Sequence, residues 1–161
     1  MVIAEPTDYA LDNVRIRGIM GRHAGVSGAA FGHRNVMFII EISGLRFCHL
    51  GDNSAELPSG LGAELEGLDA LLLPVDGSEH ILKFAEIDAL VEALHPAKII
   101  PHHYLIPGLT DPDSGLLGLR DWLDTRAAVK EINGQAIEIR QSDVPIESEV
   151  WVFDTCAALG Q

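Results

Sequence analysis

Two short apolar runs separated by one helical pattern constrain the fold of this chain most strongly. LDALLLPV, residues 68–75, is almost continuously apolar, and AKIIP, residues 97–101, is a second such run. Strands of this composition are typical of a sheet that is covered on both faces. Between them, apolar residues recur at helical spacing over residues 83–95, and Pro96 ends the pattern. The sequence therefore predicts a β-α-β unit and a fold of the α/β class.

The residues before this unit predict three more strands. RIRGIM (15–20), VMFIIEI (36–42) and LRFCHL (45–50) are short, rich in β-branched or aromatic residues, and bounded by turn residues. Ser43 and Gly44 form a two-residue break between the last two runs, which is a hairpin signal. We therefore expect these two strands to pair antiparallel.

The C-terminal part of the chain predicts one more helix and two more strands. The helical pattern consists of Leu116, Leu119, Trp122, Leu123 and Ala127. AIEIR (136–140) and EVWVF (149–153) read as strands. With 161 residues, no internal repeat and no linker, the chain is predicted to form a single domain spanning residues 1–161.

Composition narrows the class of protein. Hydrophobic residues make up 47% of the chain, yet no apolar run approaches the roughly 18 residues of a membrane span. The N-terminal residues lack the pattern of a secretory signal, so we expect a cytoplasmic protein with no membrane partner. Cys48 and Cys156 lie far apart without a CxxC pattern, and we expect reduced thiols that pack in the interior.

The charge balance argues against nucleic acid as a partner. The chain has 24 acidic and 11 basic residues, a net charge of -13 with neutral histidines. Such a surface repels phosphate backbones and anionic lipids. The acids are dispersed among apolar residues, which is typical of a solvated surface.

Histidines lie where several predicted strands end. His23, His49 and the pair His102-His103 occupy such positions, and Asp52 follows in HLGDN. Loops at strand ends commonly carry function in α/β folds. Imidazole and carboxylate together suit zinc and other first-row metals, so His23, Asp52 and His103 are candidate ligands. Each signal also has an ordinary structural interpretation, because Gly-Asp-Asn is a common turn sequence and single histidines often lie at the surface.

The order of these residues resembles the C-terminal half of the metallo-β-lactamase fold, and most of all the UlaG-like zinc-dependent hydrolases. The resemblance rests on RHAGVSGAAFGHRN, VMFIIEISGLRF, HLGD, DALLLPVDG and IIPHHY, which span roughly residues 23–104. It implies half of an αββα sandwich, a mixed sheet with helices. It also implies that His23 is a metal ligand, that Asp52 bridges two metal ions, and that His103 is a further ligand. Zinc is the implied metal, with manganese or iron as alternatives.

Four more residues are candidates for the pocket that the resemblance implies: His49, Asp76, His102 and Tyr104. We interpret His49 as a neighbour that shapes the loop rather than a ligand. His102 stands where the family usually has an apolar residue, commonly methionine. Asp76 either borders the pocket or belongs to a loop that caps the following helix. Tyr104 either donates a hydrogen bond to a substrate or packs against the core.

The family's upstream ligand motif is missing from the chain. Members of the family carry HxHxDH after the early strands, and neither this motif nor HxH occurs in the 161 residues. The N-terminal half of the sandwich is therefore expected to be absent, which would leave an apolar sheet face uncovered. Because such patches usually mark interfaces, we expect a second copy of the chain or a separate N-terminal half to cover this face.

Other catalytic interpretations lack the required context. Gly25, Gly28 and Gly32 precede a strand rather than a helix, with no GKS or GKT, and GVSG is not a GxSxG nucleophile elbow. By the resemblance, the predicted function is hydrolysis of an ester, amide, lactone or phosphoester bond by metal-bound hydroxide, once the site is completed. The alternative is a catalytically degenerate domain that serves as an interaction module.

Overall fold

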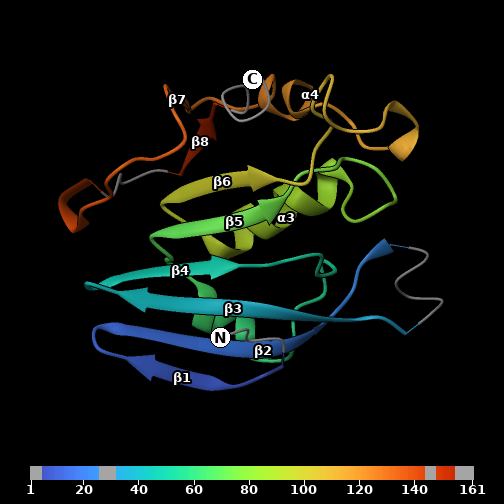
Figure 1. The fold of residues 1–161 in the computed structure, drawn as a ribbon. Helices are drawn as coiled ribbons and strands as arrows, with labels where there is room; N and C mark the ends of the chain where they lie inside the picture. The colour runs from blue at the N-terminus through green and yellow to red at the C-terminus, as the bar shows by residue number, and fades with distance from the viewer. Residues whose placement is uncertain (1–4, 26–31, 144–147, 155–161) are drawn as a thin grey trace.

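The computed structural model describes residues 5–25, 32–143 and 148–154, whose strands form one mixed sheet (Figure 1). Across this sheet the order is β1-β2-β3-β4-β5-β6-β8-β7. The strands are β1 (Asp8–Leu11), β2 (Val14–Arg22), β3 (Arg34–Ile42), β4 (Leu45–His49), β5 (Ala70–Pro74), β6 (Lys98–His102), β7 (Val129–Ile132) and β8 (Glu149–Phe153). The α-helices are α2 (Leu61–Leu65), α3 (Phe84–Leu94) and α4 (Leu119–Leu123), and two 3-10 turns are η1 (Pro112–Ser114) and η2 (Gln141–Asp143). The predicted α/β class is confirmed.

The predicted hairpin joins β3 to β4. The two strands pair antiparallel, with Ile42 opposite Leu45 next to the turn. Ser43 and Gly44 have φ angles of 52° and 79°. A two-residue turn with positive φ at both positions matches the twist of the flanking strands, which is why the sequence signal was correct here.

The predicted β-α-β unit is also confirmed. Strands β5 and β6 pair in parallel, with Leu72 opposite Ile100, and α3 forms the crossover between them. Three apolar residues of α3 are buried in the hydrophobic core: Ile87, Leu90 and Leu94. The helix ends at Leu94, and the next residue, His95, has a left-handed φ of 45° and is followed by Pro96.

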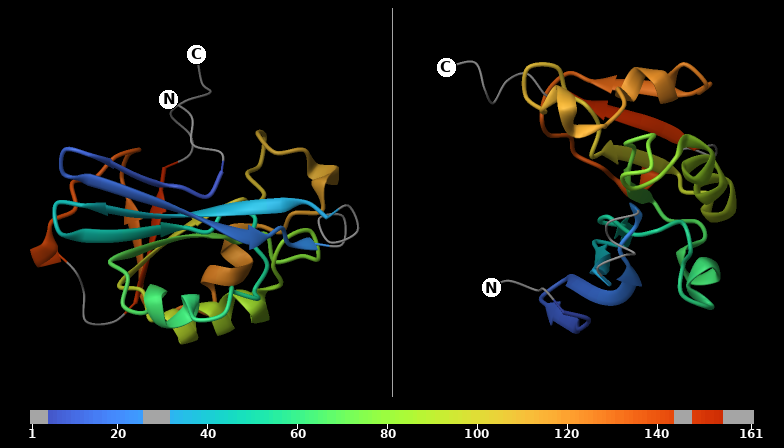
Figure 2. Two further views of the ribbon diagram at one scale, coloured as in Figure 1. Left: turned by 90° about the horizontal axis from the view of Figure 1, so that it is seen from below. Right: turned by 90° about the vertical axis from the view of Figure 1, so that its right-hand side faces the viewer.

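The hydrophobic core lies between the sheet and the layer formed by α2 and α3 (Figure 2). Side chains alternate between the two faces of a strand, so every second residue faces this layer. The buried strand residues on this side are Met37, Ile39, Cys48, Leu71, Leu73 and Ile99. Cys48 is a free, buried thiol, as expected, and Cys156 lies outside the described residues.

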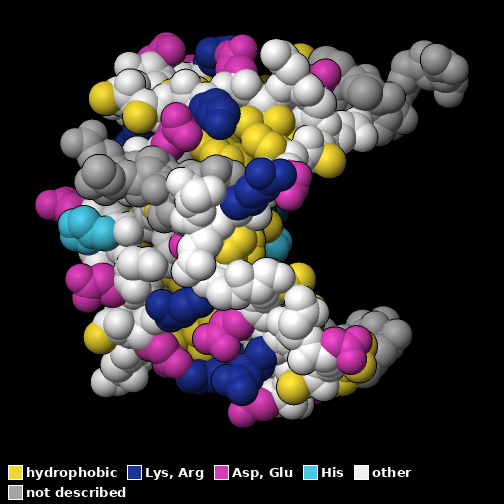
Figure 3. Space-filling view, turned by 90° about the vertical axis from the view of Figure 1, so that its left-hand side faces the viewer, with side chains coloured by type: hydrophobic (Ala, Val, Ile, Leu, Met, Phe, Trp, Pro, Cys, Tyr) yellow, Lys and Arg dark blue, Asp and Glu magenta, His cyan; other side chains and the backbone are white. Residues whose placement is uncertain are grey.

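No described helix covers the opposite face of strands β2 to β5, and we call this the open face (Figure 1, Figure 2). Leu45 and Ala70 on this face are buried, whereas other apolar side chains of the face are partly exposed. They include Ile16, Phe38, Ile40, Phe47, Leu72 and Ile100. Figure 3 shows that the twisted sheet makes this side of the molecule hollow.

The C-terminal strand prediction was wrong in one place. Residues 136–140 form no strand, and Ile137 is 37% exposed. Instead, Val129–Ile132 forms β7 and pairs in parallel with β8. The alternating pattern of AIEIR has no neighbouring strand to supply its hydrogen bonds, and a strand requires such a partner. The predicted strand at residues 149–153 is confirmed as β8.

Within the described residues, no helix is long and apolar enough to span a bilayer. The helix α3 has 11 residues, whereas a span needs about 20.

Candidate metal centre

The structure brings the three predicted metal residues together at one edge of the sheet. His23 follows β2, Asp52 lies in the turn after β4, and His103 follows β6. Strands β4, β5 and β6 are parallel, so their carboxyl ends lie at the same edge. Strand β2 ends there as well, because β2 and β4 both pair antiparallel with β3. The topology thus joins loops that are far apart in the sequence.

Asp52 lies between the two histidines. Its Oδ2 is 3.6 Å from Nε2 of His23, and its Oδ1 is 3.2 Å from Nδ1 of His103. The side chain of Asp52 is 37% exposed and both histidine side chains are 26% exposed. The carboxylate is therefore reachable from solvent, and each of its oxygens faces one imidazole.

The hydrogen bond of His23 determines which of its nitrogens can accept a cation. Nδ1 of His23 is 2.7 Å from the carbonyl oxygen of Ala24. A carbonyl only accepts, so Nδ1 must carry the proton, and in neutral His23 the lone pair is on Nε2. That lone pair faces a carboxylate oxygen of Asp52, an arrangement that becomes favourable when a proton or a metal ion lies between the two atoms.

Asp52 and His103 change each other's affinity for protons. The hydrogen bond from His103 is the main reason why the pKa of the Asp52 carboxyl is lowered, and partial burial opposes this effect. The same hydrogen bond raises the pKa of His103. The site therefore favours positive charge beside a charged carboxylate, and a metal ion would compete with the proton for that place.

Two asparagines that the sequence analysis did not single out build the turn around Asp52. Oδ1 of Asn35 accepts from the backbone N–H of Asp52 at 3.1 Å, and its Nδ2 donates to the Leu50 carbonyl at 2.8 Å. Asn53 is 1% exposed, and its Oδ1 accepts from the N–H of Arg22 at 3.0 Å. These bonds tie the ends of β2, β3 and β4 together. The only sequence signal was the position of both asparagines next to the glycine loop and the GD step.

His49 and His102 stack on each other beside the candidate centre, with ring centroids 4.8 Å apart. Nδ1 of His49 accepts from the N–H of Gly51 at 2.9 Å, so this ring supports the turn that precedes Asp52. Nε2 of His102 is buried and has no hydrogen-bond partner among the described residues. Burial is the main reason why the pKa of His102 is lowered to about 4, which keeps the ring neutral.

Asp76 organises a loop. It is 0% exposed and accepts from Ile81 N–H at 2.9 Å, Leu82 N–H at 2.7 Å and Ser78 Oγ at 2.7 Å. Tyr104 is half-buried and packs against the hydrophobic core, and burial raises the pKa of its hydroxyl. Both residues are therefore engaged by the protein itself.

Two further histidines lie next to the predicted ligands. The ring of His33 meets that of His23 edge to face, with centroids 5.7 Å apart. The ring of His80 lies 5.4 Å from that of His103. Sequence reasoning left both residues aside, because neither stands in a recognisable ligand spacing.

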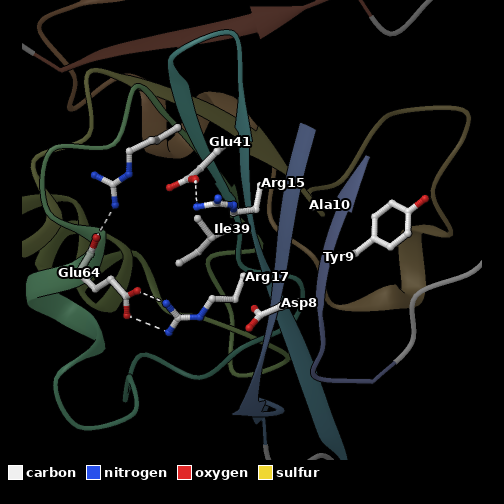
Figure 4. A pocket seen from close by; sticks show the side chains of 9 residues that line it. Asp8, Tyr9, Ala10, Arg15, Arg17, Ile39, Glu41 and Glu64 are labelled. Atoms are coloured by element: carbon white, nitrogen blue, oxygen red, sulfur yellow. Dashed lines mark hydrogen bonds and ion pairs between the residues drawn. The ribbon is translucent and has the colours of Figure 1, made fainter. Parts of the chain in front are cut away.

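Cavities near the centre are shallow. His23 lines one of about 200 Å³, together with residues of the loops at 24–25 and 54–56. A larger cavity of about 340 Å³ lies elsewhere, along β1, β2 and β3 (Figure 4). There Arg17 forms a two-pronged ion pair with Glu64, and Arg15 lies 3.6 Å from Glu41. Its charges pair among themselves, so we do not treat it as the reactive site.

The donor chemistry at Asp52 fits a first-row metal, but the arrangement is not a finished metal site. Imidazole nitrogen and carboxylate oxygen are zinc ligands, and Nε2 of His23 already faces the carboxylate. Among the described residues, however, no group of three or more His, Cys, Asp or Glu side chains converges closely enough to hold an ion. Ion binding would therefore require movement of side chains or further donors.

Comparison with known protein families shows which family the chain belongs to. A family model described as a beta-lactamase superfamily domain matches residues 1–103, which include β1 to β6 and all three candidate ligands. The chain belongs to the β-lactamase superfamily. No curated protein matches this chain.

Solved structures show the same fold for this superfamily domain. A candidate Zn-dependent hydrolase of the metallo-β-lactamase superfamily from Thermotoga maritima is 29% identical, with a TM-score of 0.76 over 95% of this chain and 71% of its own. A candidate metal-dependent hydrolase from Parabacteroides distasonis is 18% identical, with a TM-score of 0.52 over 73% of this chain and 55% of its own. YhfI from Bacillus subtilis, a metallo-β-lactamase fold protein, is 11% identical, with a TM-score of 0.55 over 94% and 52%. The domain thus spans only about half of the last two chains.

Proposed function

We propose that this superfamily domain is a metal-dependent hydrolase whose metal site is centred on Asp52, with His23 and His103 as ligands. The observation that carries the proposal is the position of one carboxylate between two imidazoles, at 3.6 Å and 3.2 Å. The likeness to the Thermotoga maritima protein, at 29% identity, supports the same function. We assign the domain to the UlaG-like group on its HLGD and PHHY sequences.

Zinc is the first candidate for the metal, with manganese or iron as alternatives, because imidazole and carboxylate ligands suit all three. Such an ion supplies Lewis acidity toward an ester, amide, lactone or phosphoester bond. Asp52 holds negative charge at the site, and His103 Nδ1 holds the proton that the hydrogen bond to Asp52 favours. The cavity beside His23, at about 200 Å³, is smaller than the roughly 300–1,000 Å³ of typical ligand pockets.

Metal content tests this proposal directly. Wild-type protein, Asp52→Asn and His103→Gln are dialysed against zinc and then against metal-free buffer, and the metal per chain is measured by elemental analysis. His95→Gln is the matched control, because His95 directly follows α3 in an exposed position near the opposite edge of the sheet. We expect wild type and control to retain zinc and both site variants to lose it. Equal retention in all four proteins would refute the assignment of Asp52 and His103.

The open face favours a second function, that of an interaction module. Partly exposed apolar side chains lie on neighbouring strands of this face. Figure 3 shows that this side of the molecule is hollow. Burying such a surface in a complex would be strongly favourable. We propose a second copy of the chain or a separately encoded N-terminal half as the cover. Sedimentation of wild type and an Ile40→Asp variant tests the first option: a dimer that the variant dissociates supports self-association, and a monomeric wild type excludes it.

A further inference from the structure

A hollow of about 340 Å³ lies at the amino ends of β2 and β4, away from the candidate metal centre (Figure 4). Its volume is within the roughly 300–1,000 Å³ of typical ligand pockets. Arg15 lines it and precedes His23 by eight residues, which is about 26 Å of extended strand. The hollow is therefore a separate site, and what it binds is independent of the proposed hydrolysis.

The register of the strands places three arginines of the hollow on one face of the sheet. Arg15 of β2 and Arg46 of β4 both lie opposite Glu41 of β3. Arg17, two residues after Arg15, lies opposite Ile39. Residues that are directly opposite, or two apart on one strand, face the same side. Ile39 is 5% exposed and thus forms an apolar base beside the arginines.

Glu64 of α2 fixes two of these arginines in different ways. Its carboxylate forms a two-pronged ion pair with Arg17 (Figure 4). Its backbone carbonyl oxygen accepts from Nη2 of Arg46 at 2.6 Å. A carbonyl carries no net charge, and among the described residues no carboxylate forms an ion pair with Arg46. The guanidinium of Arg46 is therefore held in place without being neutralised.

The third arginine is paired only loosely. Nη1 of Arg15 lies 3.6 Å from Oε2 of Glu41, which is longer than a normal hydrogen bond (Figure 4). The two side chains are 73% and 44% exposed. An ion pair so open to solvent contributes little to stability. A ligand can therefore replace the Glu41 carboxylate beside Arg15, and Glu41 can turn toward water.

The chemistry of the hollow suits a small carboxylate. The planar fork of a guanidinium matches the two oxygens of a carboxylate. Asp8, Glu41 and Glu64 line the same hollow, so a dianion such as phosphate meets more repulsion there than a monoanion does. Ile39 and Ala10 offer contact to a short apolar chain.

We propose that this hollow binds the anion of a small carboxylic acid, whose carboxylate takes the place of Glu41 beside Arg15, is contacted by Arg46, and directs its apolar chain toward Ile39. The site lies beyond the proposed hydrolase function and does not rest on it.

Butyrate is the probe for this site, in an NMR titration of the full chain that follows the backbone amide signals. Sodium butyrate replaces sodium chloride at constant ionic strength, so that general screening stays the same. Wild type is compared with Arg15→Gln, Arg46→Gln and the control Arg120→Gln. Arg120 is a matched control because it is also an exposed, paired arginine, 74% exposed and bound to Glu131.

We expect saturable shifts at the strand residues that line the hollow in wild type and control. Each of the two site variants should bind butyrate at least about tenfold more weakly, because a charge-assisted contact is lost. Glu41→Gln should bind about twofold to fivefold more tightly, because the competing carboxylate is gone. A gain in affinity of this kind cannot result from loss of folding.

Four results would overturn the proposal. They are no saturable shift in wild type, equal affinity in the two arginine variants and the control, no gain in Glu41→Gln, and binding of inorganic phosphate at these residues as tight as that of butyrate. Arg15→Gln keeps the test valid even when Arg46→Gln disturbs α2, because the Arg15 side chain contacts only Glu41 among the described residues.

Discussion

Replacement of Asp76 by alanine should destabilise the protein strongly, because Asp76 is fully buried and its hydrogen-bond partners cannot turn to water instead. Its carboxylate accepts three hydrogen bonds, two of them from the backbone N–H groups of Ile81 and Leu82. Both of these residues are buried, at 4% and 1% exposure, so their N–H groups would have no water to bind after the substitution.

The magnitude follows from these two donors. A buried backbone N–H left without a partner costs about 1–3 kcal/mol, which gives about 2–6 kcal/mol for the pair. Removing a buried carboxylate returns part of this cost, because burial of a charge is itself unfavourable. We therefore expect Asp76→Ala to lower the free energy of unfolding by about 2–4 kcal/mol. Asp76→Asn keeps one acceptor oxygen and should lose about half as much.

Urea denaturation followed by circular dichroism measures the effect, with zinc removed by a chelator. The midpoint should fall while the denaturant slope stays unchanged, because the folded state remains compact. A free energy of unfolding within about 0.5 kcal/mol of wild type would refute the assigned role of Asp76.

Two further predictions concern the same edge of the sheet. Burial lowers the pKa of His102 to about 4, below the value of about 6.5 for an unfolded histidine, so the unfolded chain binds more protons once the pH falls below about 6.5. With metal removed by a chelator, the wild type should therefore lose about 2–3 kcal/mol of folding free energy between about pH 7 and about pH 4.5. An equal loss in the His102→Met variant would show that the protonation of His102 is not the cause. Gly25 and Gly32 have φ angles of 75° and 61°, but only at Gly25 would a side chain meet another atom, the His80 carbonyl. Gly25→Ala should thus cost at least about 1 kcal/mol more than Gly32→Ala and should weaken zinc binding, and equal effects would show that loop packing is unimportant.

The elements that the sequence predicted correctly carry their signal locally. The positive φ angles at Ser43 and Gly44 follow from the turn itself, and the apolar spacing of α3 lies within a single segment. The wrong strand prediction at residues 136–140 arose because strand pairing there depends on residues that are distant in the sequence. The pattern there suits a strand, but β8 pairs instead with Val129–Ile132 and β6, and this choice depends on residues distant in the sequence.

For the candidate site, too, part could be predicted from the sequence and part could not. Residue types and a family resemblance were enough to select His23, Asp52 and His103, because imidazole and carboxylate at strand ends are recognisable in one dimension. Nothing in the sequence placed His33 beside His23 or His80 beside His103. The first pair depends on the register of β2 against β3, and the second depends on the parallel pairing of β5 with β6. The sequence by itself determined strands β2 to β6 and β8, the crossover helix and the kinds of donor available. Only the tertiary structure decided which donors meet, because hydrogen bonding between distant strands sets the register that brings their loops together.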